Sequence, residues 1–197
     1  PGVEQVDVVE INPGYLQAAQ AYPAQARALK DPRVQIVVDD ARRWLRQHPN
    51  KQYDLIIMNT TWHWRSNISL LLSTEFLQLM KIHMAPGAVL SFNATGSPDA
   101  FYTASKVFSY AYRYVNFVYA ADFDFRARKD TTATRQLYQS LSLGGAPLFV
   151  PSSPAIEQFL AKPFVGIETV QKTAQRPLEQ ITDHNMVTEF KYGKPLY

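Results

Sequence analysis

Short apolar runs alternate along this chain with segments in which apolar residues recur at helical spacing. The apolar runs cover residues 6–11, 34–38, 53–58 and 88–94. The helical patterns that follow them cover residues 13–29, 41–47, 73–84 and 97–110. We expect Pro23 to break or kink the first helix, because proline removes a backbone donor. Strands that alternate with helices in this way predict an α/β fold with a mostly parallel sheet and right-handed crossovers.

The second half of the chain predicts an edge of the sheet and then more helices. Pro86-Gly87 is expected to turn the chain into the fourth strand. An aromatic and β-branched run at residues 112–121 predicts a further strand, and residues 123–126 are its candidate partner in an antiparallel hairpin. Helices are expected over residues 131–143, 153–161 and 165–175.

Composition agrees with a folded domain and excludes several functions. The 197 residues are 46% hydrophobic and 19% charged, which suffices to bury a core. The net charge of +3 includes no Lys/Arg block longer than two, so no nucleic-acid partner is indicated. There is no cysteine, no apolar run of membrane-spanning length and no metal-binding spacing such as HExxH. We predict a core over residues 1–130 and a helical C-terminal extension over residues 131–197.

Glu10 is the first candidate for a functional residue. It closes the first apolar run and therefore lies at the carboxyl end of a buried strand, where open α/β sheets bind their ligands. A carboxylate at that position can accept hydrogen bonds from both hydroxyls of a ribose. The alternative is a solvent-exposed acid at the end of a strand. We place Ile11 beside Glu10 in the same candidate cofactor site.

Asp39, Asp40 and Ala41 form the second candidate, at the junction of the next strand and helix. A carboxylate there can accept from an exocyclic amine, and the start of the helix offers a backbone N–H, which together suit the edge of an adenine. The alternative is ordinary N-capping by Asp39 or Asp40, which needs no ligand.

The loop after the third strand holds the remaining candidates, which are Asn59, Thr60, Trp62, His63, Trp64 and Arg65. Trp62, Trp64 and Arg65 can wall a pocket, stack on a base or hold a cation over a ring, so we assign them to the substrate. Histidine as a residue type can exchange a proton near neutral pH, so His63 is the candidate catalytic base. The alternative is that the tryptophans pack under a lid while His63 is solvated.

Two further polar features have simpler interpretations. Asp99 follows a Ser-Pro pair at a predicted helix start, where a capping role is favoured over a functional one. The cluster Asp183-His184-Asn185, with Glu189, either covers the site or forms a solvated turn.

Four blocks of this sequence resemble the spermidine synthase (polyamine aminopropyltransferase) family. The blocks are VDVVEINP, DPRVQIVVDDARRWL, YDLIIMNTTWHW and STEFLQLMKIHMAPGAVL. The resemblance covers roughly residues 3–120 and implies the S-adenosylmethionine-binding, Rossmann-like (methyltransferase-type) fold. The tail ITDHNMVTEFKYG is similar to the end of larger bacterial spermidine synthase-like proteins, some of which carry membrane-spanning segments before this domain.

By this resemblance, Glu10 matches the acid that holds the cofactor ribose, while Asp40 and Ala41 match the residues at the adenine. Asn59 and Thr60 fall at the same site, and Asn59 stands where aminopropyltransferases carry an aspartate that helps to deprotonate the amine. An amide cannot take that proton, and Arg65 would repel a polycationic amine. Together with these two departures, the resemblance implies a transferase that is either active, altered in its activity, or inactive.

The family's glycine-rich loop and the strand before it fall ahead of residue 1. None of the eight glycines here forms GxGxxG after a strand. We therefore expect the first strand to be missing, the cofactor to bind weakly, and the open strand edge to be covered by a homodimer contact or a reorganised sheet.

Three functions follow as hypotheses. The first is aminopropyl transfer from S-adenosylmethionine or decarboxylated S-adenosylmethionine to an amine or another small nucleophile. The second is methyl transfer from the same cofactor site. The third is a non-catalytic nucleoside-binding or structural domain of a larger membrane protein. All three fit a cytoplasmic location, including the cytoplasmic face of a membrane.

Overall fold

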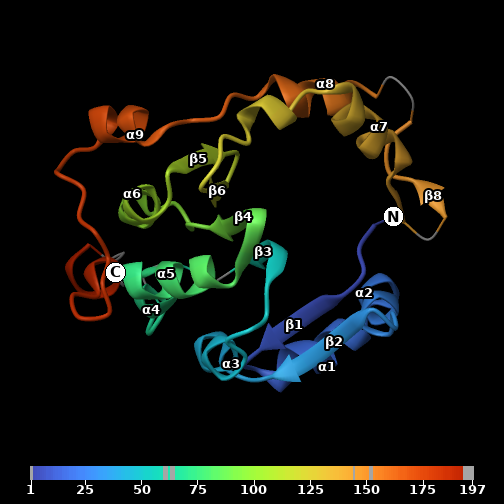
Figure 1. Ribbon diagram of the computed structural model, residues 1–197, viewed down its shortest axis with the longest axis horizontal. Coiled ribbons are helices and arrows are strands. Elements are labelled where there is room, and N and C mark those ends of the chain that lie inside the picture. The colour runs from blue at the N-terminus through green and yellow to red at the C-terminus, as the bar shows by residue number, and fades with distance from the viewer. Residues whose placement is uncertain (1, 60–61, 63–64, 144, 151–152, 193–197) are drawn as a thin grey trace. The chain divides into compact units, whose positions relative to one another are not determined.

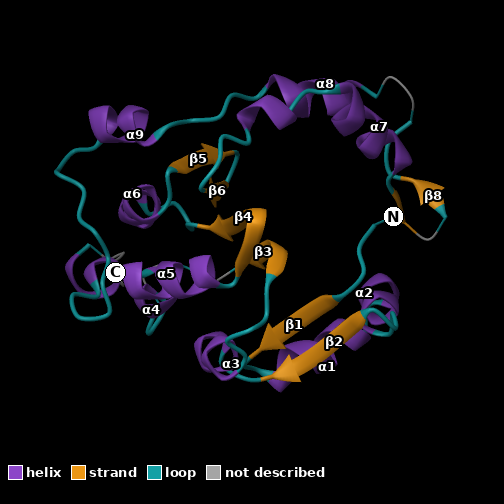
Figure 2. Cartoon of the chain, viewed as in Figure 1, coloured by secondary structure: helices purple, strands orange, loops and turns teal. Residues whose placement is uncertain are grey.

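The computed structural model describes residues 2–59, 62, 65–143, 145–150 and 153–192. The chain forms two compact units, Pro1–Lys51 and Gln52–Tyr197. Strands and helices are present in both units (Figures 1 and 2), as the sequence predicts for an α/β fold. In the part of the chain that is described, no helix is both long and apolar enough to cross a membrane.

The N-terminal unit is built on two parallel strands. β1 (Val6–Glu10) pairs with β2 (Val34–Val38) in continuous register. The connection holds two helices, α1 (Pro13–Gln20) and α2 (Pro23–Leu29), and α3 (Ala41–Gln47) follows β2. The helix does break before Pro23, as predicted. Pro23 is the first residue of α2, where the backbone N–H would have no partner within the helix and its absence is tolerated.

An ion pair and a ring stack order the interior of this unit. The Asp7 side chain on β1 is only 3% exposed, and its Oδ2 lies 2.5 Å from the Lys51 Nζ. Lys51 also lies over the ring of Trp44, which is buried on α3 and stacks on His48 with ring centroids 3.6 Å apart. A charge taken out of water in this way is tolerated because its partner is in direct contact.

The C-terminal unit contains a four-stranded mixed sheet in the order β3-β4-β6-β5. Its strands are β3 (Tyr53–Met58), β4 (Met84–Asn93), β5 (Tyr110–Tyr114) and β6 (Phe117–Ala121). β3 and β4 are parallel, whereas β6 is antiparallel to both β4 and β5. The helices α4 (Ser69–Leu72), α5 (Thr74–Ile82) and α6 (Pro98–Val107) join these strands. Fully buried aromatic and aliphatic side chains form the core, among them Phe76, Leu77, Leu90, Phe92 and Phe101.

Pro86 and Gly87 do not form the turn that the sequence predicts. They lie inside β4, which begins at Met84. The register with β3 shifts between Tyr53↔Met84 and Leu55↔Val89, so extra residues are accommodated on β4. Gly87 has φ +81°, a conformation that glycine adopts without steric cost and that permits such a bulge.

The hairpin at the sheet edge also differs from the prediction. Residues 112–121 do not form one strand, because the chain reverses at Val115-Asn116 between β5 and β6, where Tyr114 pairs with Phe117. Residues 123–126 do not pair in a strand, and a 3-10 helix at Arg126–Arg128 follows. Val115 has φ +56°, which is rare for a β-branched residue, so the sequence carries no ordinary turn signature there.

The C-terminal part is largely helical, as expected. It contains α7 (Thr132–Ser140), α8 (Pro154–Ala161), α9 (Ile167–Thr173) and a short π-helix, η2 (Val187–Lys191). A small antiparallel pair, β7 (Ser142–Leu143) with β8 (Ala146–Pro147), was not predicted. The division of the chain at residue 130 stays a prediction.

Asp99 anchors the C-terminal segment and does not cap a helix. Ser97 caps α6 by accepting from the Ala100 N–H, whereas the Asp99 side chain binds a segment far away in the sequence. Asp99 is 1% exposed and forms a two-point ion pair with Arg176, in which Nη1 lies 3.0 Å from Oδ1 and Nη2 contacts Oδ2. Its Oδ1 also accepts from the Glu179 N–H at 2.8 Å.

The polar cluster near the C-terminus is in part a solvated turn, because His184 and Asn185 are exposed in a turn at residues 183–185, but Asp183 and Glu189 pack on helices. Asp183 Oδ1 accepts from the Ser73 hydroxyl at 2.6 Å, at the start of α5. Glu189 Oε1 accepts from the Ser69 N–H at 3.1 Å, at the start of α4. Just before this cluster in the chain, Ile181 is fully buried and its N–H donates to the hydroxyl of Thr103 on α6. The segment is therefore part of the packed C-terminal unit.

The Asp99–Arg176 pair gives a test of this packing. We expect Asp99→Asn to lower the free energy of unfolding of the C-terminal unit by roughly 2–3 kcal/mol, since it leaves a partly buried guanidinium without its counter-charge. Urea unfolding followed by circular dichroism measures the loss. Asp124→Asn is the control, because it breaks an exposed pair with Arg126 and should cost much less. Equal losses in the two variants would contradict the anchoring role.

Candidate functional site

The two acidic strand ends of the N-terminal unit lie side by side. Glu10 is in register with Val38, and the Asp39 N–H donates to the Glu10 carbonyl at 3.2 Å. The pairing is parallel, so both strands end at the same edge of their sheet. This brings Glu10 and the Asp39-Asp40 pair together, as the sequence analysis expects. Their roles toward a ligand stay predictions.

The Glu10 carboxylate is half-buried and is held by the turn that follows it. Its Oε1 accepts from the Asn12 N–H at 2.7 Å, and the Asn12 side chain in turn caps α1 by accepting from the Gly14 N–H at 2.9 Å. The other oxygen, Oε2, has no hydrogen-bond partner among the described residues. The carboxylate is thus fixed in direction and retains acceptor capacity. Ile11, beside it, is 67% exposed.

Asp39 is committed to an ion pair with Arg43 on α3. Its Oδ1 lies 2.5 Å from the guanidinium of Arg43 and also accepts from the Asp40 N–H at 2.6 Å. The hydrogen bond from Arg43 is the largest influence that lowers the pKa of Asp39, and the Asp40 N–H adds to it, while desolvation opposes both. Asp39 is therefore ionised at neutral pH.

Asp40 caps α3, so the prediction that it is an N-cap residue is confirmed. Its Oδ1 accepts from the Arg43 N–H at 2.8 Å, and Ala41 begins the helix. Capping uses one carboxylate oxygen, and Oδ2 has no partner among the described residues. A cap and a ligand contact are compatible at this residue.

The loop after β3 is described only in part. Thr60, His63 and Trp64, which the sequence analysis assigns to the cofactor, to catalysis and to the substrate, lie outside the described residues. Asn59 Oδ1 accepts from the Asn93 side-chain amide at 3.1 Å. These two residues follow or end parallel strands, so the structure joins the ends of β3 and β4 by a side-chain contact.

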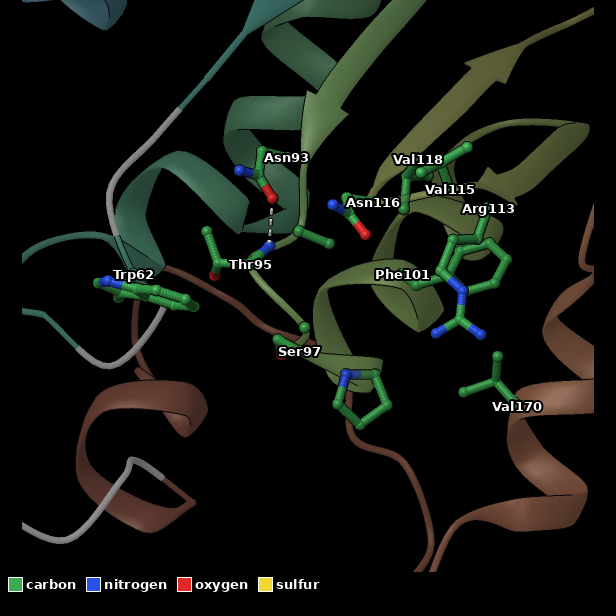
Figure 3. A pocket seen from close by; sticks show the side chains of 13 residues that line it. Trp62, Asn93, Thr95, Ser97, Phe101, Arg113, Val115, Asn116, Val118 and Val170 are labelled. Atoms are coloured by element: carbon green, nitrogen blue, oxygen red, sulfur yellow. Dashed lines mark hydrogen bonds between the residues drawn. The ribbon is translucent and has the colours of Figure 1, made fainter. Parts of the chain in front are cut away.

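Trp62 lines a pocket of about 430 Å³ in the C-terminal unit, beside the end of β4 (Figure 3). Trp62 is 54% exposed, and its carbonyl accepts from the Arg65 N–H at 2.9 Å. Arg65 itself is exposed and is not among the residues that line the pocket. The volume falls within the range of about 300–1,000 Å³ that small-molecule sites occupy.

Most of the pocket comes from residues that the sequence analysis did not select. Polar side chains are contributed by Asn93, Thr95, Ser97, Arg113 and Asn116, and apolar ones by Phe101, Val115, Val118 and Val170. Asn93 Oδ1 accepts from the Thr95 N–H at 2.8 Å, and Thr95 and Gly96 both have positive φ, which turns the chain from β4 into α6 (Figure 3).

A sequence cue for this turn exists. The residues Asn-Ala-Thr-Gly-Ser come at the end of an apolar strand. Open α/β sheets bind their ligands at the carboxyl ends of the strands, and this applies to the fourth strand as it does to the first three. Arg113 and Val170 have no such cue, because they approach from a hairpin and from the C-terminal helical part. Among the described residues, no group of three or more histidines or acids is placed to hold a metal ion.

Comparison with known sequences decides the family. The profile of the spermine/spermidine synthase domain matches residues 1–122. The chain belongs to this family. The resemblance seen in the four sequence blocks is thereby confirmed, and its extent is close to the expected residues 3–120.

A curated relative is a polyamine aminopropyltransferase of Mycobacterium tuberculosis (strain H37Rv), which is 35% identical over 108 residues. The match covers 53% of this chain but 20% of the relative, so the chain corresponds to about a fifth of that protein's length.

Two solved structures establish the fold class. One is a spermidine synthase in complex with the transition-state analogue AdoDATO, with a TM-score of 0.63 and 20% identity over 86% of this chain and 60% of that one. The other is human methyltransferase-like protein 13 in complex with SAH, with a TM-score of 0.51 and 16% identity over 81% of this chain and 72% of that one. The fold is Rossmann-like and of the methyltransferase type.

The Asp39–Arg43 ion pair should make the stability of the N-terminal unit depend on pH. In the folded state the pKa of Asp39 is lowered, so the pair stabilises the N-terminal unit above the unfolded pKa of about 3.9 and is lost as the pH falls through the folded pKa. We expect Arg43→Gln to move the Asp39 titration midpoint upward, as measured by NMR of its carboxyl carbon. Arg46→Gln removes the same charge from the same helix and should leave the midpoint in place. An unchanged midpoint in Arg43→Gln would contradict the assigned cause.

Proposed function

We propose that this protein transfers an aminopropyl group from an adenosyl-sulfonium donor to a small nucleophile. The observation that carries the proposal is the pair of carboxylates, Glu10 and Asp40, at the carboxyl ends of adjacent parallel strands in a member of the spermine/spermidine synthase family. Each has one oxygen held by the backbone and one without a described partner. Two such acceptors at one sheet edge suit the donor groups of an adenosine.

The donor set of the N-terminal unit fits an adenosyl group. Glu10 Oε2 can accept from a ribose hydroxyl, and Asp40 Oδ2 can accept from the exocyclic amine of adenine. Both solved neighbours contain ligands of adenosyl type, AdoDATO and SAH, which supports this class of donor. Decarboxylated S-adenosylmethionine is the donor for aminopropyl transfer, and intact S-adenosylmethionine is the donor for the alternative, methyl transfer.

The chemistry demands little from acid-base groups of the protein. The lone pair of the acceptor nitrogen forms a bond to the methylene carbon next to the sulfonium. The carbon–sulfur bond breaks, its electrons stay on sulfur to give neutral methylthioadenosine, and the new ammonium loses a proton. Since the positive sulfur is already a good leaving group, the protein's share is to align the partners and exclude water.

Asn59 is positioned to orient an acceptor but not to deprotonate it. Its Oδ1 already accepts from Asn93, which fixes the side-chain amide at the end of β3. An amide oxygen accepts a hydrogen bond from an amine without taking its proton. His63 therefore stays the candidate base, and the proton goes to it or to solvent.

Methyl transfer is the second candidate, and Asn59 favours it. A neutral residue at this position removes the carboxylate that aminopropyl transfer uses in the resembling family, and a methyltransferase-like protein shares the fold. The products separate the two functions. Methylthioadenosine marks aminopropyl transfer, S-adenosylhomocysteine marks methyl transfer, and nucleoside binding without either product marks a non-catalytic domain.

The experiment incubates the full-length protein with decarboxylated or intact S-adenosylmethionine and a panel of amines, and identifies the nucleoside product by mass spectrometry. We expect methylthioadenosine from the decarboxylated donor. S-adenosylhomocysteine alone, or binding without product, would overturn the proposal. The homodimer and the cytoplasmic location are separate proposals, and analytical ultracentrifugation tests the first of them.

Asn59→Asp gives a gain-of-function prediction. The aspartate keeps the oxygen that accepts from Asn93 and adds a carboxylate that can take the proton of the amine. We expect kcat/KM for an amine acceptor to rise about 100-fold, the lower end of what general-base catalysis contributes. Asn50→Asp, an equal change of charge outside the site, is the control. No gain at Asn59, with S-adenosylhomocysteine accumulating, would favour methyl transfer.

A further inference from the structure

Arg113 is the one charged side chain among the described residues that line the pocket of the C-terminal unit. The others are apolar or neutral and polar, and no carboxylate is among them. Figure 3 shows Arg113 with Phe101 and Val170 on the side of the pocket opposite Trp62, with Asn93 and Asn116 between. A pocket meant for a diamine would be expected to offer a negative charge to each ammonium. This one offers a positive charge.

Arg113 is held on both sides of its strand. On one side it is in register with Val118 of β6. On the other, its N–H donates to the Val165 carbonyl at 2.9 Å and its carbonyl accepts from the Val165 N–H at 2.8 Å. Both backbone hydrogen-bonding groups of Arg113 are therefore used by Val165, while the register with Val118 places the residue in the β5–β6 ladder. Together these contacts preorganise the base of the side chain.

The guanidinium of Arg113 has no acidic partner in the described part of the chain. This sets it apart from three other arginines of the same unit, since Arg126, Arg135 and Arg176 each pair with an aspartate. A guanidinium presents a planar fork of donors that matches a carboxylate in two parallel hydrogen bonds. An arginine that lines a pocket without an acid partner is available for the anionic group of a ligand.

The rest of the wall suits an aliphatic chain that ends in polar groups. Phe101, Val118 and Val170 provide apolar surface, and Phe101 and Val118 are almost fully buried, so their positions are set by the core. The side-chain amide of Asn116, at the hairpin turn, has no described hydrogen-bond partner and can accept from an amine. Such a combination fits a short amino acid better than a simple diamine.

We propose that this pocket binds a carboxylate-bearing ligand, with Arg113 as the residue that determines specificity. The acceptor of the transfer reaction is then an amino-acid-type amine, and simple diamines are discriminated against. The identification of the ligand as an acceptor rests on the proposed function, but the binding of a carboxylate does not. The same chemistry is offered by the amino-acid end of intact S-adenosylmethionine, which is the second source of a carboxylate.

The test compares ligands that differ only by that group. Binding of ornithine and of putrescine, its decarboxylated counterpart, is measured by calorimetry on the full-length protein with methylthioadenosine present. We expect ornithine to bind at least about tenfold more tightly than putrescine, and Arg113→Gln to abolish that ratio by weakening ornithine alone. Arg113→Lys keeps the charge without the fork and should retain part of the preference.

A parallel arm replaces the amines with intact and decarboxylated S-adenosylmethionine. If the Arg113-dependent preference is found only here, the carboxylate belongs to the donor, and the inferred binding chemistry still holds. Lys172→Gln on α9, exposed and outside the pocket lining, controls for the general change in charge. Because the ratio is taken within one variant, a loss of stability that affects both ligands equally cancels.

The outcomes separate this inference from the proposed function. Ornithine binding that depends on Arg113, without any transfer product, supports the carboxylate site and refutes the transferase. Transfer to putrescine with no preference for either carboxylate-bearing ligand, unchanged in Arg113→Gln, supports the transferase and overturns the carboxylate site. Equal binding of all four ligands in both forms of the protein overturns it as well.

Discussion

Parallel strand pairing is the constraint on which both candidate sites depend. When two strands run in the same direction, their carboxyl ends meet at one edge of the sheet, and the loops that leave them are neighbours even when many residues separate them. In the N-terminal unit, this places Glu10 beside Asp39, 29 positions later in the chain. In the C-terminal unit, it places Asn59 within hydrogen-bonding distance of Asn93. Neither pair would form in an antiparallel hairpin of the same strands.

The side chains at these strand ends also stabilise the local fold. One oxygen of Glu10 accepts from the turn that leads into α1, one oxygen of Asp40 caps α3, and Asp39 forms an ion pair with Arg43. Such bonds orient the carboxylates before any ligand arrives, which reduces the ordering that binding requires. A carboxylate has more acceptor positions than one backbone N–H can use. The same residue can therefore stabilise the local fold and still bind a ligand.

Local sequence patterns were sufficient for most of the elements and for the side-by-side placement of Glu10 and the Asp39-Asp40 pair. The strands at residues 34–38 and 53–58 and the helix at 41–47 follow directly from apolar spacing and from clear stop residues. The reversal at Val115 was missed because its positive φ is imposed by the pairing of β5 with β6, and a valine gives no indication of it. The placement of Pro86-Gly87 within β4 likewise depends on register with β3.

Local sequence patterns also identify only some of the residues that line the pocket. Asn93 could have been found from its place at a strand end, but Arg113 and Val170 reach the pocket only through the hairpin and the C-terminal helical part. The ion pair of Asp99, which stabilises the fold, could not be predicted from the local sequence either, since its partner Arg176 lies 77 positions away. Contacts over such separations depend on tertiary packing, and no local pattern in a single sequence specifies them.

The most direct measurement of the central claim is an NMR titration of the isotopically labelled protein with methylthioadenosine, followed at the backbone amides. If the ends of β1 and β2 bind the adenosine, the largest shifts fall at residues 10–12 and 39–41, and Glu10→Gln weakens binding while Glu4→Gln does not. Shifts that fall elsewhere, or equal affinity in both variants, would contradict the account.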